Sequence, residues 1–284
     1  MYINTLVTTE DLARHLQDPK WVVFDCRFTL TDPEAGRRAY AEGHIPGARY
    51  VHLEEDLSGP IVPGKTGRHP LPEAAVLADK LCHLGVGVNK QVVVYDDSFG
   101  AMAVRMWWLL RWLGHPAVAL LDGGLPKWKR EMRPLTTEVP QPEKAKCVCL
   151  PEASQIVGAE DVLHAMHGSG ELIIDARPER RFTGEFEPLD PVAGHVPGAV
   201  NWNFEDNLDI DGTFLPPEAL RENYQALLKG RPPWKVIHMC GSGVTACHNL
   251  LAMEIAGLPG SRLYPGSWSE WITDPSRPIA TGET

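Results

Sequence analysis

The sequence predicts an α/β fold made of two homologous domains, each a mainly parallel β-sheet flanked by helices. Two observations predict it. Short apolar runs alternate with helical patterns along the chain, and the second half repeats segments of the first in the same order. Such alternation is typical of parallel strands joined by helices. The length of 284 residues suits two ordinary domains.

Each half contains three predicted strands and three predicted helices. A buried strand of a parallel sheet is a short continuous apolar run, whereas a helix repeats apolar residues every three to four positions. The predicted strands are residues 21–25, 92–96, 117–121, 171–175, 235–239 and 261–264. The predicted helices are residues 9–17, 72–84, 101–113, 159–167, 217–228 and 245–256.

Four short segments recur in both halves. The matched pairs are 22–27 (VVFDCR) with 172–177 (LIIDAR), 43–48 (GHIPGA) with 194–199 (GHVPGA), 92–96 (VVVYD) with 236–240 (VIHMC), and Asp122-Gly-Gly plus Trp128 with Pro265-Gly-Ser plus Trp271. Four matches in one order indicate a duplication. The proline-rich residues 131–146 are predicted to link a first domain, 1–130, to a second domain, 147–284.

Composition excludes several classes of partner. The net charge is 27 − 37 = −10, which argues against nucleic acid and against anionic membranes as general partners. The first residues lack a basic segment followed by an apolar one, and no stretch reaches the ~18 apolar residues of a membrane span. We therefore expect a soluble, cytoplasmic protein.

The cysteines do not form a metal-binding pattern. None of their spacings resembles a paired CxxC site, so we expect no metal and no other cofactor. A long chain without an export signal is also a poor candidate for disulfides. We therefore expect five of the six cysteines to be packing residues: Cys26, Cys82, Cys147, Cys149 and Cys247.

Cys240 is the exception, because it stands between a predicted buried strand and a glycine-containing loop that leads into a helix. The glycines allow backbone amides to fold inward around the sulfur, and these amides and the helix N-terminus favour a thiolate. We predict that Cys240 is a nucleophile whose adduct is bound by the loop residues Gly241, Ser242, Gly243, Val244 and Thr245. The first half has Asp96 or Asp97 at the corresponding position. Since an aspartate is no sulfur nucleophile, we expect only the second domain to be catalytic, with the first domain shaping the cleft.

The repeated DxR and GH(I/V)PGA segments, the single cysteine loop and the Gly-Ser-Trp at 266–268 resemble the tandem-domain rhodaneses over almost the whole chain. The loop CGSGVT at 240–245 resembles that of 3-mercaptopyruvate sulfurtransferases, whereas thiosulfate rhodaneses typically have arginine and lysine after the cysteine. The resemblance implies that a small anionic donor transfers sulfur to Cys240. The resulting persulfide then passes it to cyanide or to a thiol, such as thioredoxin.

The resemblance also implies partners for Ser242. In the family a serine here is proposed to act with a histidine and an aspartate of the first domain, which would be His44 and Asp32. A second interpretation stays open, because His195 occupies the same segment of the second domain. The histidine could then serve turn packing in both domains.

Arg181 matches the family arginine that binds the anionic group of the donor. A guanidinium can bind a carboxylate with two parallel hydrogen bonds. Arg27 and Arg177 recur in both domains and are predicted to be structural. Mercaptopyruvate enzymes usually carry a second arginine about nine residues beyond the first, but residues 187–190 (EPLD) contain no cation.

Three functions are weighed. Sulfur transfer from 3-mercaptopyruvate comes first, followed by transfer from thiosulfate and by a non-catalytic sulfur-carrier or binding module. A phosphatase or arsenate reductase would need an arginine six positions after the cysteine, where this chain has Ala246.

Overall fold

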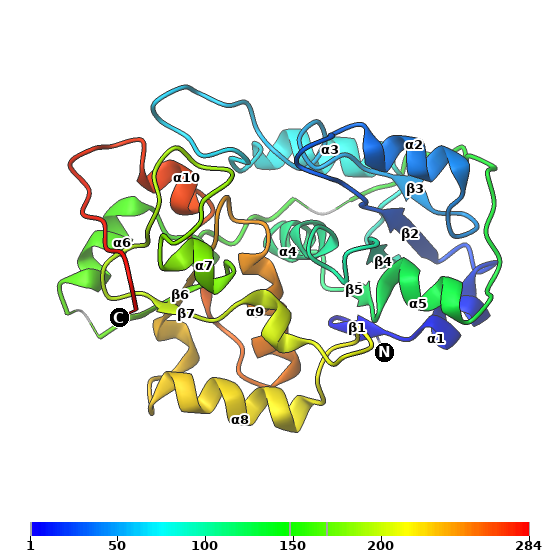
Figure 1. The fold of residues 1–284 in the computed structure, drawn as a ribbon. Helices are drawn as coiled ribbons and strands as arrows, with labels where there is room; N and C mark the ends of the chain where they lie inside the picture. The colour runs from blue at the N-terminus through cyan, green and yellow to red at the C-terminus, as the bar shows by residue number, and fades with distance from the viewer. Residues whose placement is uncertain (1, 148, 169, 284) are drawn as a thin grey trace. The chain divides into compact units, whose positions relative to one another are not determined.

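The computed structural model describes residues 2–147, 149–168 and 170–283 (Figure 1). The chain divides into two units that are not contiguous in sequence. The first unit comprises Met1–Gly59, Pro72–Glu152 and Ile210–Phe214, and the second comprises Pro60–Leu71, Ala153–Asp209 and Leu215–Thr284. These units differ from the predicted domains in four respects. Residues 60–71 belong to the second unit, whereas the predicted linker, residues 147–152 and residues 210–214 belong to the first.

The first unit is built on a five-stranded parallel sheet. Its strands are β1 (Leu6–Val7), β2 (Trp21–Asp25), β3 (Arg49–Tyr50), β4 (Gln91–Tyr95) and β5 (Val118–Leu121), in the spatial order β1-β5-β4-β2-β3. Its helices are α1 (Thr9–His15), α2 (Ala35–Glu42), α3 (Ala74–His83), α4 (Ala103–Trp112) and α5 (Gly124–Arg130).

The second unit repeats this topology with a four-stranded parallel sheet. Its strands are β6 (Leu172–Asp175), β7 (Val200–Asn201), β8 (Val236–Met239) and β9 (Arg262–Leu263), in the order β7-β6-β8-β9. Its helices are α6 (Ala159–Met166), α7 (Glu179–Phe182), α8 (Pro217–Leu228), α9 (Ala246–Ile255) and α10 (Ser267–Trp271), with short 3₁₀ turns at Ala153–Gln155, Phe204–Asn207 and Pro233–Lys235. A parallel bridge from Ile156 to Leu263 takes the place that β1 has beside β5.

The six predicted strands are confirmed as β2, β4, β5, β6, β8 and β9, with ends within one residue. The six predicted helices are confirmed within two residues at each end. The elements that were not predicted are the two-residue strands β1, β3 and β7 and four helices, α2, α5, α7 and α10. These segments are too short, or too interrupted by glycine and proline, to show a full period of apolar residues.

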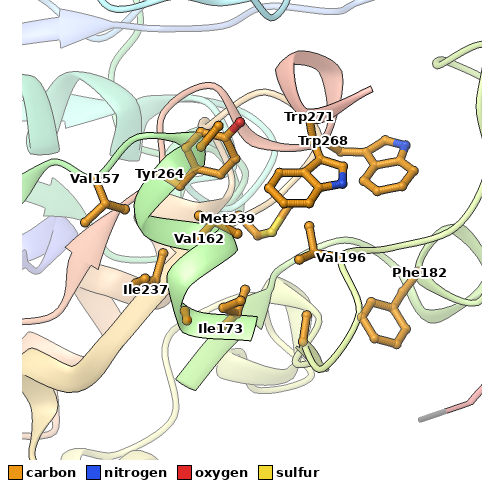
Figure 2. Packing of buried hydrophobic residues seen from close by; sticks show 13 residues of the cluster. Val157, Val162, Ile173, Phe182, Val196, Ile237, Met239, Tyr264, Trp268 and Trp271 are labelled. Atoms are coloured by element: carbon orange, nitrogen blue, oxygen red, sulfur yellow. The ribbon is translucent and has the colours of Figure 1, made fainter. Parts of the chain in front are cut away.

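Equivalent hydrophobic clusters support the two sheets. In the second unit, Met239 of β8 packs in one cluster with Trp268 and Trp271 of α10 (Figure 2). In the first unit, Tyr95 of β4 packs in a cluster with Trp128 of α5. The repeated tryptophans are therefore core residues that fasten the last helix of each repeat to its sheet.

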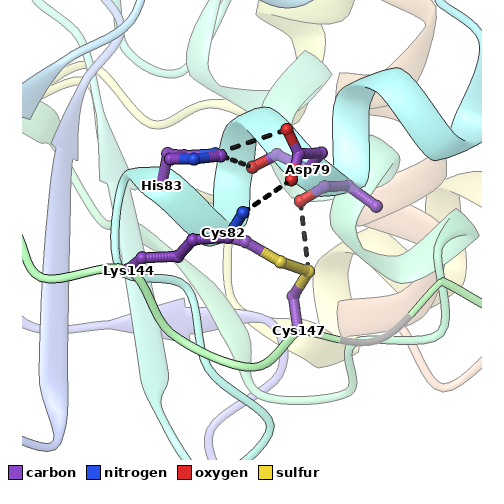
Figure 3. The surroundings of a disulfide bond; sticks show 6 residues. Asp79, Cys82, His83, Lys144 and Cys147 are labelled. Atoms are coloured by element: carbon purple, nitrogen blue, oxygen red, sulfur yellow. Dashed lines mark hydrogen bonds and ion pairs between the residues drawn. A yellow bond between two sulfur atoms is a disulfide. The ribbon is translucent and has the colours of Figure 1, made fainter.

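The predicted linker and the residues that follow it up to Glu152 are part of the first unit. Thr136 forms an antiparallel bridge with His44, and the Leu150 N–H donates to the Leu113 carbonyl over 3.0 Å. Cys147 forms a disulfide with Cys82 of α3 (Figure 3). The prediction that these two cysteines are only packing residues is therefore wrong. Sequence spacing did not reveal the pair, because its members lie 65 positions apart.

Within residues 2–147, 149–168 and 170–283, no helix is long and apolar enough to span a membrane.

Candidate active site

Cys240 lies directly after β8, at the carboxyl edge of the second sheet, where open parallel sheets bind their ligands. It is a free, buried cysteine. Its N–H donates to the Ser267 hydroxyl over 3.1 Å, and its carbonyl accepts from the Trp268 N–H at 3.0 Å. Helix α10 thus fixes the backbone on both sides of the sulfur-bearing residue.

Two glycines are required in the following loop for different reasons. Gly243 has φ +75°, a conformation that side chains other than glycine disfavour, and it packs against the backbone of Pro265. Gly241 is required because two arginine side chains approach its Cα closely. A methyl group on its Cα would meet Nη2 of Arg68 at 2.9 Å and both terminal nitrogens of Arg181 at 3.5 Å. The absence of a side chain at Gly241 therefore lets two guanidinium groups reach the residue beside Cys240.

Ser242 forms a hydrogen bond with a histidine. Its Oγ lies 2.7 Å from Nδ1 of His69, and both residues are buried. His69 belongs to residues 60–71, the segment from the first half of the sequence that folds into the second unit. This segment is fastened beside the loop, because the Arg68 N–H donates to the Ser269 hydroxyl over 3.1 Å while the Ser269 N–H donates to the Gly241 carbonyl over 2.9 Å.

The guanidinium groups near the loop are held by carboxylates. Arg181 donates through Nε and Nη2 to Glu187 over 2.8–3.1 Å, and through Nη2 to Asp190 over 3.1 Å. Arg68 donates through Nη1 to the other oxygen of Asp190. Burial raises the pKa of Asp190 above its ordinary value, although the neighbouring arginines oppose this shift. Burial also favours a higher pKa for Glu187. The hydrogen bonds from Arg181 and from backbone N–H groups outweigh this effect, so the pKa of Glu187 is lowered.

Arg177 lies deeper and has a structural role, as predicted from the repeat. It donates to Asp175 through Nε and Nη2 and to the Gly194 carbonyl at 2.7 Å. Arg27 forms the same bonds with Asp25 and with the Gly43 carbonyl in the first unit. Each arginine ties its sheet to the following GH(I/V)PGA segment.

The structure corrects the predicted partners of Ser242. His44 is buried, stacks on Tyr40 at 3.8 Å, and has both ring nitrogens within 3.0 Å of the carbonyls of Tyr40 and Glu138. His195 repeats this arrangement, with a 3.8 Å stack on Phe182 and a 2.8 Å contact to its carbonyl. The interpretation as turn packing in both repeats therefore describes His44, and the histidine at Ser242 is His69.

Asp32 is also not paired with a histidine. Its carboxylate binds Arg38, and its side chain is 51% exposed in the first unit. The remaining predicted loop residues do adjoin Cys240 in the chain. Val244 is buried, and the carbonyls of Val244 and Thr245 accept the N–H groups of Cys247 and His248 at 3.0 Å, which starts α9.

Sequence reasoning missed Arg68 and His69. They lie in a turn-rich stretch, residues 59–72, that has no counterpart among the repeated segments. Their position outside the repeated segments was the only sequence feature that could have pointed to a role specific to one half. A histidine that recurs in both halves serves the shared fold, whereas one found outside the repeats is free to serve the site of one half.

One cluster in the first unit has the donor types of a metal site. Donor atoms of Glu34, His52 and Glu55 lie within 4.8 Å of one another. Arg37, however, donates to both carboxylates, over 3.1 Å to Glu34 and 2.6 Å to Glu55. The His52 ring accepts backbone N–H groups at Nδ1 and contacts the Pro33 carbonyl through Nε2. An arginine already neutralises these carboxylates, so the cluster is an ion-pair network.

Comparison with known proteins gives the family. The rhodanese-like domain family matches residues 8–131 and 159–274. The chain is 52% identical over 279 residues to the "Probable 3-mercaptopyruvate sulfurtransferase" of Pseudomonas aeruginosa, with 98% of each protein covered. It is 34% identical to the thiosulfate sulfurtransferase of Mus musculus, covering 95% of this chain and 92% of that protein.

Solved structures give the same result. The crystal structure of SseA from Escherichia coli, titled for the rhodanese fold and the catalytic mechanism of 3-mercaptopyruvate sulfotransferases, superimposes with a TM-score of 0.79 at 34% identity. The superposition covers 93% of this chain and 99% of that one. These matches confirm the predicted fold class and enzyme class. The chain belongs to the rhodanese-like family, as a sulfurtransferase with two rhodanese-like domains.

Proposed function

We propose that this protein transfers a sulfur atom from 3-mercaptopyruvate to an acceptor through a persulfide on Cys240. The observation that carries the proposal is the set of groups around one free cysteine: the glycine-containing loop 241–245, a Ser242–His69 hydrogen bond, and guanidinium groups at Gly241. The backbone N–H groups of the loop can stabilise a developing negative charge, and the Ser242–His69 pair can relay a proton. The guanidinium groups can bind an anionic substrate.

The transfer proceeds in two covalent steps. In the first step the Cys240 thiolate attacks the sulfur of the donor and forms an S–S bond. The C–S bond of the donor breaks, and its electron pair leaves on pyruvate as the enolate. The Ser242–His69 pair lies beside the loop where it can relay a proton to that leaving group. In the second step the acceptor attacks the outer sulfur, and the electron pair of the S–S bond returns to Cys240 as a thiolate.

The charge of the site favours a donor with one negative charge. Residues 241–245 contain no cation, and the nearby guanidinium groups of Arg68, Arg181 and Arg177 are matched by nearby carboxylates. Thiosulfate carries two charges and no carbonyl group. Mercaptopyruvate carries one carboxylate and a carbonyl oxygen that can accept a hydrogen bond from Ser242. Thiosulfate is therefore the second candidate donor.

The acceptor is proposed from its chemistry. Cyanide and small thiols are nucleophiles that can take the outer sulfur of a persulfide, and thioredoxin is a protein thiol of this class. We propose that the protein works in the cytoplasm, where free thiol acceptors are available, even though the Cys82–Cys147 disulfide is of a kind more common in oxidising compartments. Nucleic acid and membranes are not proposed as partners, because the net charge of −10 would repel phosphates.

The test is mass spectrometry of the intact protein after incubation with each donor and removal of excess reagent. The wild type is expected to gain one sulfur atom with mercaptopyruvate and to lose it again with cyanide. Cys240→Ser is expected to gain none, whereas Cys149→Ser, at an exposed free cysteine, should behave as the wild type. A wild type that stays unmodified with both donors would favour the binding-module hypothesis.

A further inference from the structure

The first unit contains a cavity that has no part in the site around the reactive cysteine. It has a volume of about 530 Å³ and lies at the amino ends of two strands, where Trp21 begins β2 and Lys90 precedes β4. Its other walls include residues 15–19 at the end of α1, Arg49 of β3 and the segment 140–145. All of these residues belong to the first unit, so the cavity is a feature of that unit alone.

Two cations line this cavity without a carboxylate partner. Nη1 of Arg49 donates to the Leu84 carbonyl. Nζ of Lys90 donates to the Pro19 carbonyl. Among the residues that the structure describes, neither side chain forms an ion pair. The chain as a whole has a net charge of −10 and repels anions, so these two cations give the cavity a local attraction that the rest of the surface lacks.

Arg49 carries the stronger argument, because its guanidinium is partly withdrawn from water. Burial lowers the pKa of Arg49, while Tyr40 opposes this shift. Gly85, at φ +80°, lies so close to Nη1 that a methyl group there would clash with it. Within the described part of the chain, Nε and Nη2 of Arg49 have no hydrogen-bond partner. A positive charge removed from water without a counter-ion costs free energy, and an anion bound in the cavity would offset that cost.

We propose that this cavity binds a small organic molecule through its phosphate group, with Arg49 and Lys90 as the two phosphate-binding cations. A phosphate monoester carries close to two negative charges at pH 7, which matches two cations. Nη2 of Arg49 and the remaining N–H groups of the Lys90 ammonium are donors for several phosphate oxygens. The site is separate from the proposed sulfur transfer and does not depend on it.

The size of the cavity indicates a ligand larger than inorganic phosphate. Its volume of about 530 Å³ lies in the range of pockets that hold small organic molecules, about 300–1,000 Å³. Trp21 stacks on His15 with ring centroids 4.1 Å apart, and both residues line the cavity together with Pro140. A flat apolar group can pack on this surface. Asp18 and Glu143 also line the cavity, and their charges disfavour a ligand with further anionic groups.

The wall formed by residues 140–145 is fixed to the rest of the unit on both sides of the cavity. Before this wall, Thr136 forms an antiparallel bridge with His44. At its end, the Ala145 N–H donates to the Cys82 carbonyl over 2.9 Å. The cavity is therefore preformed, and a ligand does not have to order a loose segment when it binds.

The first test is isothermal titration calorimetry with phenyl phosphate, inorganic phosphate and phenol as probes. The wild type is expected to bind phenyl phosphate more tightly than inorganic phosphate, because both the charge and the apolar group contribute. Phenol, which lacks the charge, is expected not to bind measurably. Binding of phenyl phosphate should weaken as the NaCl concentration rises. Failure to bind phenyl phosphate, or an equal affinity for phenol, overturns the proposal.

The second test repeats the titration with variants of the two cations. Arg49→Gln and Lys90→Gln are each expected to weaken phenyl phosphate binding about tenfold. Arg14→Gln is the matched control, because Arg14 is exposed on α1 and pairs with Glu10. Urea midpoints establish that each variant is folded. If Arg49→Gln does not fold, Lys90→Gln decides, since the Lys90 ammonium contacts one carbonyl only. Unchanged affinity in the folded variants overturns the proposal.

A third titration separates this cavity from the cysteine loop, where guanidinium groups can also take an anion. Arg181→Gln is expected to keep the wild-type affinity for phenyl phosphate. If Arg181→Gln loses that affinity while Arg49→Gln keeps it, the anion binds at the cysteine loop and the proposal fails. Sulfur uptake from mercaptopyruvate is expected to be unchanged in Arg49→Gln. A wild type without sulfur uptake therefore refutes the proposed function and leaves the phosphate site standing.

Discussion

The loops after β4 and β8 occupy equivalent places in the two repeats but differ in what fills them. After β4, the Asp96 carboxylate accepts four backbone N–H groups of its own loop at 2.8–2.9 Å, those of Ser98, Gly100, Met102 and Ala103. Burial raises the pKa of Asp96 above its ordinary value, and these four bonds oppose that shift. The first loop is thus filled by a carboxyl group of its own chain.

The backbone of the second loop follows the first. The carbonyl of Cys240 accepts the Trp268 N–H at 3.0 Å, as the carbonyl of Asp96 accepts the Leu125 N–H at 2.9 Å. Gly243 at φ +75° stands where Phe99 stands at φ +57°. The two turns therefore share this backbone hydrogen bond and a residue of positive φ at equivalent positions. In the first turn a carboxylate accepts the backbone N–H groups strongly, whereas the cysteine sulfur of the second turn is a weak acceptor. The comparison teaches that the two repeats keep the turn and differ in the residue it presents, a buried carboxylate in the first and a free thiol in the second.

The largest expected effect comes from moving the cysteine. The double variant Cys240→Ser with Asp96→Cys places a thiol in the first loop only. We expect no sulfurtransferase activity above background, because Arg68, Arg181 and His69 lie at Gly241 and Ser242 of the second loop. The measurement is thiocyanate formation from donor and cyanide. Activity in the double variant would show that a cysteine in either turn suffices for sulfur transfer, which would contradict the proposed role of the surrounding residues.

The next effect concerns stability. Asp96→Asn replaces one acceptor oxygen by an NH₂ group that faces backbone donors. Leaving buried donors unsatisfied is expected to lower the free energy of unfolding by about 3 kcal/mol. The measurement is the urea midpoint, and Asp97→Asn, at the exposed neighbour, should change the free energy by less than about 0.5 kcal/mol. Equal midpoints for both variants would mean that Asp96 does not hold its loop together.

The strands that lead into the two loops differ in how they make the free energy of unfolding depend on pH. His238 of β8 stands where β4 has Val94, and burial lowers its pKa to about 3. The unfolded chain, with an ordinary histidine pKa near 6.5, therefore binds a proton that the folded chain does not. This contribution lowers the free energy of unfolding as pH falls from about 6.5 toward 3, by about 1.4 kcal/mol per pH unit.

His238→Val gives the second repeat the residue of the first. Relative to the wild type, the variant is expected to gain about 2 kcal/mol between pH 7 and pH 5. The measurement is urea unfolding of both proteins across this range. A difference that does not vary with pH would mean that His238 is protonated in the folded state.

The smallest expected effect concerns the arginines that distinguish the second loop. Arg181→Gln is expected to raise the donor KM about tenfold, equivalent to about 1.4 kcal/mol, while the acceptor step is unchanged. Steady-state kinetics with each substrate varied in turn give both values. The adjacent exposed Arg180→Gln serves as the control. If the two variants have the same donor KM, the second loop owes its substrate binding to groups other than Arg181.

The repeat also explains which site residues could be predicted. The strand–glycine–helix pattern predicted Cys240 and its loop as a site, because these features are local in sequence. The prediction for His44 was wrong in the structure, because the motif that contains it serves packing twice. Arg68 and His69 could not be located by spacing. They lie more than 170 residues before Gly241 and Ser242, and only the folding of residues 60–71 into the second unit brings them there.

The sequence by itself determined the duplicated α/β architecture, the six main strands and the position of the single cysteine loop. Each of these depends on short-range periodicity or on a repeated motif, which the order of residues records directly. Only the tertiary structure decided that Cys82 bonds to Cys147, that His69 rather than His44 contacts Ser242, and that Asp190 joins Arg68 to Arg181. Those contacts connect residues far apart in the chain, and their energies depend on burial and on distance, neither of which a linear pattern contains.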